Sequence, residues 1–444
     1  MIQTLLPRDP VARALTYSTM AFAASTGIFY TVSVLYFTRV VGLSAATVGL
    51  GLGIAGGAGV LGSYLAGRWS DRCGAHRVQV WGLLAQALAL AAYSFTSDAV
   101  SFTAVAVVVS AGRGVQSTAR QALLARWFTG PERVDVRARL RVVTNVLIGL
   151  GTLAAAVALL LDTAAAYRTA MVATAVLLLG AVVPLVRLPR RVPGLAARML
   201  EDAPTAPAPR SGDADGAGAE VADEAPAPHP LRDRTYVASV VLNAVVAMQF
   251  GVMTVGVPLW VASTDAPTAV VSALLVVNTA LVALLQVRAS RGTHDVRGAG
   301  RAVRRGSVLL AAACVLYAGA GYGSLVAATA LLVLAAVAHS LGEVLSEAGG
   351  WGMAFELADP RRAGAYQGLS QTGYALAGMA APVVVTALPI RFGTPGWLVL
   401  GAVFVAAGAG AAAVARRAAD RPDDAASSSP WTTQPSTEES VPAS

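Results

Sequence analysis

Three ionisable side chains lie at helical spacing within the apolar stretch 325–347. His339, Glu343 and Glu347 are four residues apart, so they share one face of an α-helix. Hydrocarbon disfavours the charged form of a carboxyl group, so Glu343, the deeper of the two, could take up and release a proton as water access alternates. His339 could share this task by ordinary titration. Alternatively, His339 is a hydrogen-bonded packing residue and Glu347 only contacts arginines near the inner membrane surface.

One arginine lies inside another apolar stretch. Arg113 is about 13 residues from the outer end of the stretch 100–120, which at ~1.5 Å per residue places it roughly 20 Å deep. A charge at that depth normally faces a cavity or a partner. We therefore expect Arg113, with Gln116 beside it, to meet an anionic group, either on a bound small molecule or on a carboxylate that takes up and releases protons. The alternative is a structural pair, or a side chain that snorkels toward the inner surface.

Further polar side chains within apolar stretches are candidates for lining a central cavity. Amides in hydrocarbon join helices more often than they bind ligands, so a helix-joining role remains open for the amides in this set. The candidates are Tyr30, Asn243, Gln249, Asn278, Gln371 and Tyr374.

The elements that would carry these residues are transmembrane helices. The chain is 55% hydrophobic and 13% charged, against about a quarter charged in soluble proteins, and roughly 20 mostly apolar residues cross a bilayer. We expect an all-α, polytopic membrane protein with twelve spans in two six-helix bundles. The expected spans are 14–38, 44–66, 77–96, 100–120, 142–162, 167–187, 236–261, 268–288, 306–322, 325–347, 366–388 and 396–416.

The two bundles are expected to comprise residues 1–189 and 236–417. Residues 190–235 are rich in Pro, Ala, Gly and acidic residues without apolar periodicity, which predicts a flexible cytoplasmic linker. Residues 418–444 have the same character and predict a disordered cytoplasmic tail.

Glycines at regular spacing occur in the second expected span. Gly49, Gly53 and Gly57 are four residues apart, and small residues at this spacing let two membrane helices approach closely. The series therefore predicts a close packing seam.

The arginines fix the expected orientation, because cytoplasmic loops retain positive residues. All 33 basic residues are arginine, and most fall in alternate connecting segments, whereas the intervening segments hold only Arg39, Arg168 and Arg391. The protein is therefore expected in the cytoplasmic membrane of the cell, with both termini and the linker on the cytoplasmic side.

The strongest local motif connects the second and third spans. The segment AGRWSDRCGAHRV contains Gly67, Asp71, Arg72, Gly74 and Arg77 in order. Its glycines permit a tight turn and close approach of a neighbouring backbone. Asp71 can accept hydrogen bonds from an arginine or from the N-terminus of a helix in the opposite bundle, which would latch one conformational state. The alternative is that Asp71 and Arg72 only solvate a cytoplasmic turn.

This segment resembles the signature loop of the major facilitator superfamily, Gly-x-x-x-Asp-Arg-x-Gly followed by basic residues. Arg113 with Gln116 is similar to the family's second motif in the same span. The stretch 359–368 resembles the connection between spans 10 and 11 in multidrug-efflux-like members, and Arg141 and Asn145 look like a pair that such members carry. The chain departs from the pattern in two places. Its fifth span lacks the glycine-proline pair of the antiporter signature, and its first span has no acidic residue.

The resemblance implies a secondary active transporter that works by alternating access, and we expect proton-coupled export of a small organic molecule. An importer of a nutrient or organic anion, anchored by Arg113, remains open. So does a transporter-shaped membrane sensor that signals through its linker or tail. The expected partners are a small-molecule substrate, protons and the lipid bilayer, and the protein is expected to be a monomer.

Other classes of protein lack their signatures in this sequence. The net charge is +8, but the basic residues are scattered between apolar runs, which does not indicate nucleic-acid binding. The lack of lysine excludes a Gly-x-x-x-x-Gly-Lys phosphate loop, and neither a Gly-x-Ser-x-Gly elbow nor a His-Glu-x-x-His motif occurs. Cys73 and Cys314 offer no metal cluster or disulfide framework. We expect no enzyme activity, no metal and no cofactor.

Overall fold

The computed structural model describes residues 7–200, 229–262, 269–322 and 324–420, and within these ranges the chain folds into helices without strands. Eleven helical segments there are long and apolar enough to cross a membrane. A further long helix, α2 (Pro10–Leu35), has 26 residues. The α2 hydroxyls of Thr16, Thr26 and Thr31 donate to backbone carbonyls one turn earlier, so they are satisfied within the helix. The expected all-α, polytopic fold is confirmed.

The first bundle runs from α2 to α7. Within it, α3 and α4 pack on α5, and α2 packs on α6 and α7. Aromatic rings fill one end of its core, where the ring centroid of Phe37 lies 4.7 Å from that of Tyr93 and 4.6 Å from that of Phe102. The elements after α2 are η1 (Tyr36–Val40), α3 (Ala45–Cys73), α4 (Ala75–Ala92), η2 (Tyr93–Phe95), α5 (Ala99–Trp127), α6 (Pro131–Leu161) and α7 (Ala164–Arg191).

The second bundle begins with an interrupted crossing, in which α9, α10, η3 and α11 follow one another. In this bundle α13 packs on α14 and α16, and α12 packs on α14. Its elements are α9 (Arg234–Ala247), α10 (Gln249–Gly251), η3 (Val252–Gly256), α11 (Val257–Ala262), α12 (Ala269–Ser290), α13 (Val296–Gly319), η4 (Ala320–Tyr322), α14 (Leu325–Glu356), η5 (Pro360–Arg362), α15 (Ala363–Val385), η6 (Thr386–Ile390) and α16 (Thr394–Ala419).

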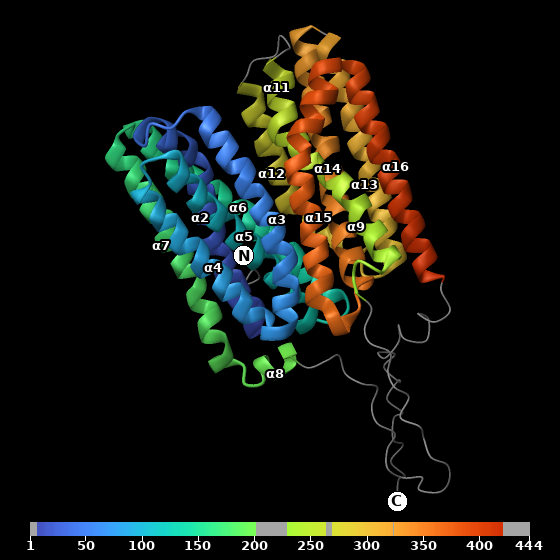
Figure 1. The fold of residues 1–444 in the computed structure, drawn as a ribbon. Helices are drawn as coiled ribbons and strands as arrows, with labels where there is room; N and C mark the ends of the chain where they lie inside the picture. The colour runs from blue at the N-terminus through green and yellow to red at the C-terminus, as the bar shows by residue number, and fades with distance from the viewer. Residues whose placement is uncertain (1–6, 201–228, 263–268, 323, 421–444) are drawn as a thin grey trace, which may run out of the picture.

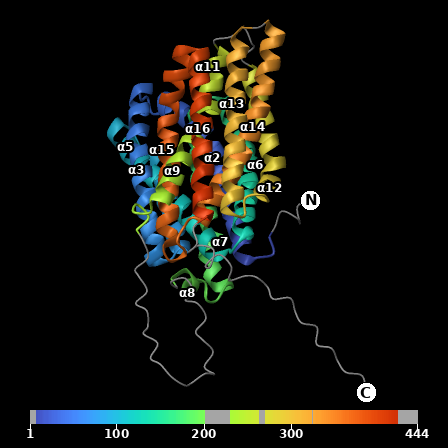
Figure 2. The ribbon, with the colours of Figure 1, turned by 90° about the vertical axis from the view of Figure 1, so that its right-hand side faces the viewer.

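The two bundles stand side by side and touch through a few helices (Figure 1). α3 and α5 of the first bundle contact α15 of the second, and α6 contacts α12 and α14. In Figure 1 the ribbons converge toward the end at which the short helix α8 (Leu195–Leu200) lies, and splay apart at the other end. Figure 2, turned by 90°, again shows α8 beyond the ends of the long helices.

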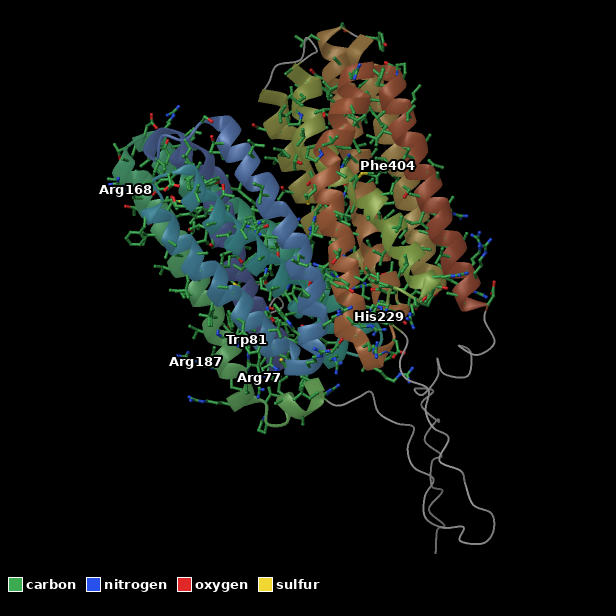
Figure 3. All side chains as sticks on the ribbon, in the orientation of Figure 1. Arg77, Trp81, Arg168, Arg187, His229 and Phe404 are labelled. Atoms are coloured by element: carbon green, nitrogen blue, oxygen red, sulfur yellow. The ribbon has the colours of Figure 1, made fainter. Side chains whose placement is uncertain are left out.

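We call the end near α8 the arginine-rich end, and define it by the turns at Gly74 and Gly130 together with α8 and η5. Figure 3 shows Arg77 and Arg187 at this end of the first bundle and Arg168 at the opposite end. The bundle contacts described below lie toward this end.

Several helices extend further at the arginine-rich end than the sequence led us to expect. α5 ends at Trp127 rather than near 120, α6 begins at Pro131 rather than near 142, and α14 ends at Glu356 rather than near 347. Arginine is a good helix former, so α5 and α6 continue past the apolar stretches that defined the expected spans. Most of the expected loop 120–141 is therefore helix.

The first residues of the segment expected to be a flexible linker are largely helical. α7 continues to Arg191, and α8 follows with Leu195 and Met199 buried in the core of the first bundle. These two apolar residues are one helical turn apart, which gives α8 a face to bury. The remainder of the expected linker, 201–228, and of the expected tail, 421–444, lies outside the described residues.

The glycine seam expected in the second span is wrong. A Cβ at Gly49, Gly53 or Gly57 would meet nothing within 4 Å. α3 packs instead through glycines on another face, such as Gly62, where a Cβ would lie 2.8 Å from the Ala111 carbonyl oxygen of α5.

Two glycine pairs bring helices together at corresponding places in the two bundles. A Cβ at Gly82 of α4 would lie 2.9 Å from the Gly112 carbonyl oxygen of α5. A Cβ at Gly306 of α13 would lie 2.7 Å from the Gly342 carbonyl oxygen of α14. Without a hydrophobic drive between helices in lipid, such close backbone packing must hold each bundle together.

Candidate functional site

Asp71, in the last turn of α3, binds the beginning of α15 in the opposite bundle. Its Oδ1 accepts the backbone N–H of Gly364 at 2.8 Å, and its Oδ2 accepts that of Ala365 at 2.8 Å. The first N–H groups of a helix lack partners within the helix and carry its positive dipole, so a carboxylate is well suited to this place. Gly364 is required here, because a Cβ would lie 2.5 Å from the Asp71 Oδ1.

Asp71 also forms an ion pair within its own bundle. Arg126 Nη2, near the end of α5, donates to Asp71 Oδ1 at 2.9 Å, and the two side chains are only 7% and 17% exposed. Asp71 therefore connects α3, α5 and α15. A latch contact of this kind was expected from the sequence, and its role in a conformational cycle remains a prediction.

The other members of the expected latch separate into two groups. Gly67 lies against α15, since a Cβ there would be 2.5 Å from the Gly364 carbonyl oxygen. Gly74 has φ = 86°, a left-handed conformation that favours glycine, and ends α3. Arg72 is exposed, and Arg77 lies on α4 beside a cavity near α7 and α8, away from the Asp71 contact.

A buried ion pair joins the bundles deeper in the molecule. Arg141 Nη2 of α6 donates to Glu343 Oε1 of α14 at 2.9 Å, and the Glu343 side chain is 5% exposed. Asn278 Nδ2 of α12 donates to the other carboxylate oxygen of Glu343 at 2.9 Å and to Ser340 Oγ at 3.1 Å. Both oxygens of Glu343 are thus occupied, one of them by the opposite bundle.

A second carboxyl group lies one turn further along α14. Tyr374 of α15 donates its hydroxyl to Glu347 Oε1 at 3.0 Å, and Glu347 is 5% exposed. Arg137 and Arg141 both lie close enough to interact electrostatically with Glu347. The guanidinium carbon of Arg137 also lies 4.7 Å from the ring centroid of Trp351, within range of a cation–π interaction.

The cluster has more arginines than carboxyl groups. Arg120 of α5 lies near Arg137 and Arg141, and within the described ranges no carboxylate forms an ion pair with it. The Nε of Arg120 and the Nη1 of Arg137 are buried without a hydrogen-bond partner in that part of the chain. Three guanidinium groups and two carboxyl groups, those of Glu343 and Glu347, therefore lie in this region, which leaves one more arginine than carboxyl groups. We call these five residues the central charge cluster.

The residues singled out around Arg113 lie elsewhere. Arg113 donates to the hydroxyl of Tyr30, and its guanidinium carbon lies 5.0 Å from the Tyr30 ring centroid. Its partner within the described ranges is thus a phenol on α2, whose ring face also attracts a cation, and a contact of Arg113 with an anionic group remains a prediction. Gln116 is 2% exposed and packs between α4 and α5 against Gly82.

His339 forms its hydrogen bond with a residue other than Glu343, although both side chains lie on one face of α14. Its Nε2 lies 2.7 Å from Gln249 Oε1, and both side chains are at most 1% exposed within the second bundle. Among the remaining cavity candidates, Gln371 crosses to the first bundle, where it donates to Ser117 Oγ at 2.7 Å. Asn243 donates to Ser239 Oγ at 3.3 Å within α9.

The sequence analysis missed Arg120, Arg137 and the contacts at the end of α14. Arg133 forms an ion pair with Glu356, and its guanidinium carbon lies 5.6 Å from the Phe355 ring centroid. A signal was present, because Arg133, Arg137 and Arg141 are four residues apart and share one helix face. The spacing was not used, because Arg133 and Arg137 were expected to lie in a loop before the fifth span.

Comparison with known proteins identifies the family. The sequence profile of the Major Facilitator Superfamily matches residues 15–382, whereas the comparison with curated proteins gave no match. The fold is similar to a bacterial homologue of the iron transporter ferroportin, solved in the outward-facing state with soaked iron. The TM-score is 0.69 at 14% identity, over 93% of this chain and 100% of that chain.

The fold is also similar to the human organic anion transporter MFSD10 (TETRAN), with a TM-score of 0.62 at 16% identity, over 90% of this chain and 99% of that chain. At such identities the two similarities concern the fold alone. Because the family profile covers most of the chain and the helices form two bundles, the protein belongs to the Major Facilitator Superfamily of membrane transporters.

Proposed function

We propose that the protein is a proton-coupled secondary transporter that exports a small organic molecule by alternating access. The observation that carries this proposal is the buried ion pair between Arg141 and Glu343, which joins the two bundles. We assign the arginine-rich end to the cytoplasm, because positively charged residues stay on that side of a membrane. With this assignment the bundles touch on the cytoplasmic side, as in an outward-facing state.

Protonation of Glu343 would remove the charge that holds Arg141. Neutralising one partner of a buried ion pair costs about 3–5 kcal/mol. Arg141 is 27% exposed, so the lower end of that range applies. At ~1.4 kcal/mol per factor of ten, a loss of about 3 kcal/mol changes the balance between two conformations roughly a hundredfold. Proton uptake at Glu343 thus favours separation of the bundles at the arginine-rich end, and release of the proton favours their return.

Export is preferred to import because residues 359–368 resemble the corresponding stretch of efflux-type members. The two similar structures are those of a ferroportin homologue and of an organic anion transporter, whose cargoes differ. They therefore support transport of a small solute without naming it.

The test is solute flux in liposomes that contain the purified protein, measured for a panel of organic compounds with and without an imposed pH gradient. The gradient should accelerate flux of at least one compound by the unmodified protein, and Glu343→Gln should abolish that acceleration. Glu356→Gln is the matched control, since Glu356 is on the same helix but pairs with Arg133 near its end. A gradient response that survives in Glu343→Gln would assign coupling to another group.

The direction of transport is tested in cells. Cells that express the protein should lose a preloaded compound faster than cells that lack it. Faster accumulation of the compound in expressing cells would support the importer instead.

A second candidate function, transport of organic anions, is favoured by the excess of arginines over carboxyl groups in the central charge cluster. A cargo carboxylate would neutralise the positive charge near Arg120 and Arg137 once the cluster opens. Within the same panel, 2-naphthoate should then be transported faster than the neutral 2-naphthamide, and Arg137→Gln should remove the difference. Equal rates for the two compounds in the unmodified protein would exclude this cargo class.

A further inference from the structure

Arg77 belongs to the signature motif but has no part in the contact between the bundles. It lies instead at a cavity of about 200 Å³ formed by α4, α7 and α8. Figure 3 shows Arg77 at the arginine-rich end of the first bundle. Within the described ranges Arg77 forms no ion pair. The role of this side chain therefore has to be sought in the cavity.

The polar side of the cavity is formed by His76 and Arg77. His76 is 4% exposed, and its Nδ1 is buried without a hydrogen-bond partner among the described residues. A buried polar atom left unpaired costs about 1–3 kcal/mol, so a group that entered the cavity and reached this nitrogen would stabilise the site. A second exposed arginine, Arg187, follows the cavity residue Val186 on α7 at the same end of the bundle (Figure 3).

The conformation of Gly74 permits this arrangement. Its φ of 86° turns the chain between α3 and α4, and a Cβ there would lie 3.2 Å from the His76 ring and 3.6 Å from Met199. A larger residue would be strained by this φ and would crowd the His76 ring. The glycine of the signature motif thus shapes the cavity as well as the turn.

The remaining walls of the cavity are apolar, and part of them faces outward. Val80 and Leu185 contribute to them, and Trp81 and Val186 are 51% and 55% exposed. In a membrane transporter such exposed apolar faces contact lipid, and tryptophan concentrates at the level of the headgroups. The cavity therefore has cations and an unpaired polar atom on one side and a surface for hydrocarbon on the other.

We propose that this cavity binds the phosphate of an anionic phospholipid, with an acyl chain lying along Val80, Leu185 and Val186. Cationic pockets between helices on the cytoplasmic side suit anionic headgroups. A free phosphate would use only the cations and leave the apolar walls uncovered, so a lipid matches the whole site better. The proposal needs only that the bundle is embedded in a bilayer, and is independent of the transported substrate and its coupling.

The test is retention of lipid by the purified full-length protein, measured by native mass spectrometry in detergent. Phosphatidylglycerol should be retained in preference to phosphatidylcholine. Each arginine near a membrane surface strengthens binding of an anionic lipid about fivefold, so Arg77→Gln should weaken retention by that factor and Arg77→Gln with Arg187→Gln by about 25-fold. Arg168→Gln, at the opposite end of α7, should leave retention within about twofold.

Two features keep the result interpretable. Arg187→Gln alone changes one exposed side chain and should weaken retention, so it tests the proposal even where the double variant fails to fold. Replacing both arginines with lysine keeps the positive charges and should keep most of the binding. Equal retention of the two lipids, or an equal effect of Arg168→Gln, would overturn the proposal. Displacement of phosphatidylglycerol by an equal concentration of glycerol phosphate would also overturn it, because the site would then bind a free anion.

Discussion

Replacing Asp71 with asparagine tests whether the contact between α3 and α15 holds the arginine-rich end together. The carboxylate uses both of its oxygens, because Oδ1 accepts from Gly364 and Arg126 and Oδ2 accepts from Ala365. An asparagine has one oxygen and one NH₂ group, so at least one of the backbone N–H donors would face another donor. The ion pair with Arg126 would also be lost.

The size of the effect follows from these contacts. A hydrogen bond to a charged group contributes about 1.5–3 kcal/mol. Asp71 is only 17% exposed, so solvent screening removes little of this contribution. Losing one such bond and weakening the others should cost roughly 2 kcal/mol, which at about 1.36 kcal/mol per decade favours opening of the contact around thirtyfold.

Amide hydrogen exchange of peptides that cover residues 361–370 measures this opening directly. In Asp71→Asn the amides of Gly364 and Ala365 should exchange about thirtyfold faster than in the unmodified protein. Transport should slow, while equilibrium ligand binding in detergent stays within a few-fold. Asp295→Asn is the control, because Asp295 caps α13 at Gly298 with a 2.7 Å bond inside one bundle. Unchanged exchange in folded Asp71→Asn, or the same acceleration in Asp295→Asn, would refute the latch.

Two further predictions concern packing and the connecting segments. Gly306→Ala should destabilise the protein by about 1–3 kcal/mol and lower its Tm in detergent, because its Cβ would lie 2.7 Å from the Gly342 carbonyl oxygen. Gly49→Ala, where a Cβ meets nothing within 4 Å, should not lower the Tm, and equal losses in the two variants would contradict this packing. Replacing residues 201–228 with a Gly/Ser segment of equal length and removing 421–444 should leave flux in liposomes intact, since the contacts between the bundles that the structure describes already involve other residues. Loss of flux in that protein would favour the sensor.

The sequence was most informative where chemistry and position depend on few residues. The contact between the bundles at Asp71 needs only Gly67, Asp71 and the start of α15 at Gly364. The motif in the sequence already contained Gly67 and Asp71. Arg77 belongs to the same motif, yet it lies near α7 and α8. A linear spacing fixes the direction of a side chain only while its helix continues, and the turn at Gly74 separates Arg77 from Asp71.

The central charge cluster shows a different limit. Periodicity placed His339 and Glu343 on one face of α14, but their partners come from other helices, and these assign His339 to Gln249 and Glu343 to Arg141. Which partner each side chain meets depends on how the neighbouring helices are rotated about their axes, and the spacing of residues within one helix does not predict that rotation. Arg137 was missed for a simpler reason, since hydropathy ends a helix where charges begin although arginines continue it readily.

The contacts of Asp71 and Glu343 between the bundles differ in the donors that hold the carboxylate. Asp71 accepts from two backbone N–H groups of α15 as well as from Arg126, whereas the bond across the bundles at Glu343 comes from Arg141 and is lost when a proton neutralises Glu343. In the proposed cycle a proton therefore removes about 3 kcal/mol from one contact and leaves roughly 2 kcal/mol at the other. Proton uptake alone leaves the arginine-rich end partly held, and interactions with the substrate must supply the difference. Coupling requires that the interactions between the bundles are divided in this way between a proton-sensitive contact and a second contact. A transporter that opened on protonation alone would carry protons across the membrane without moving a substrate.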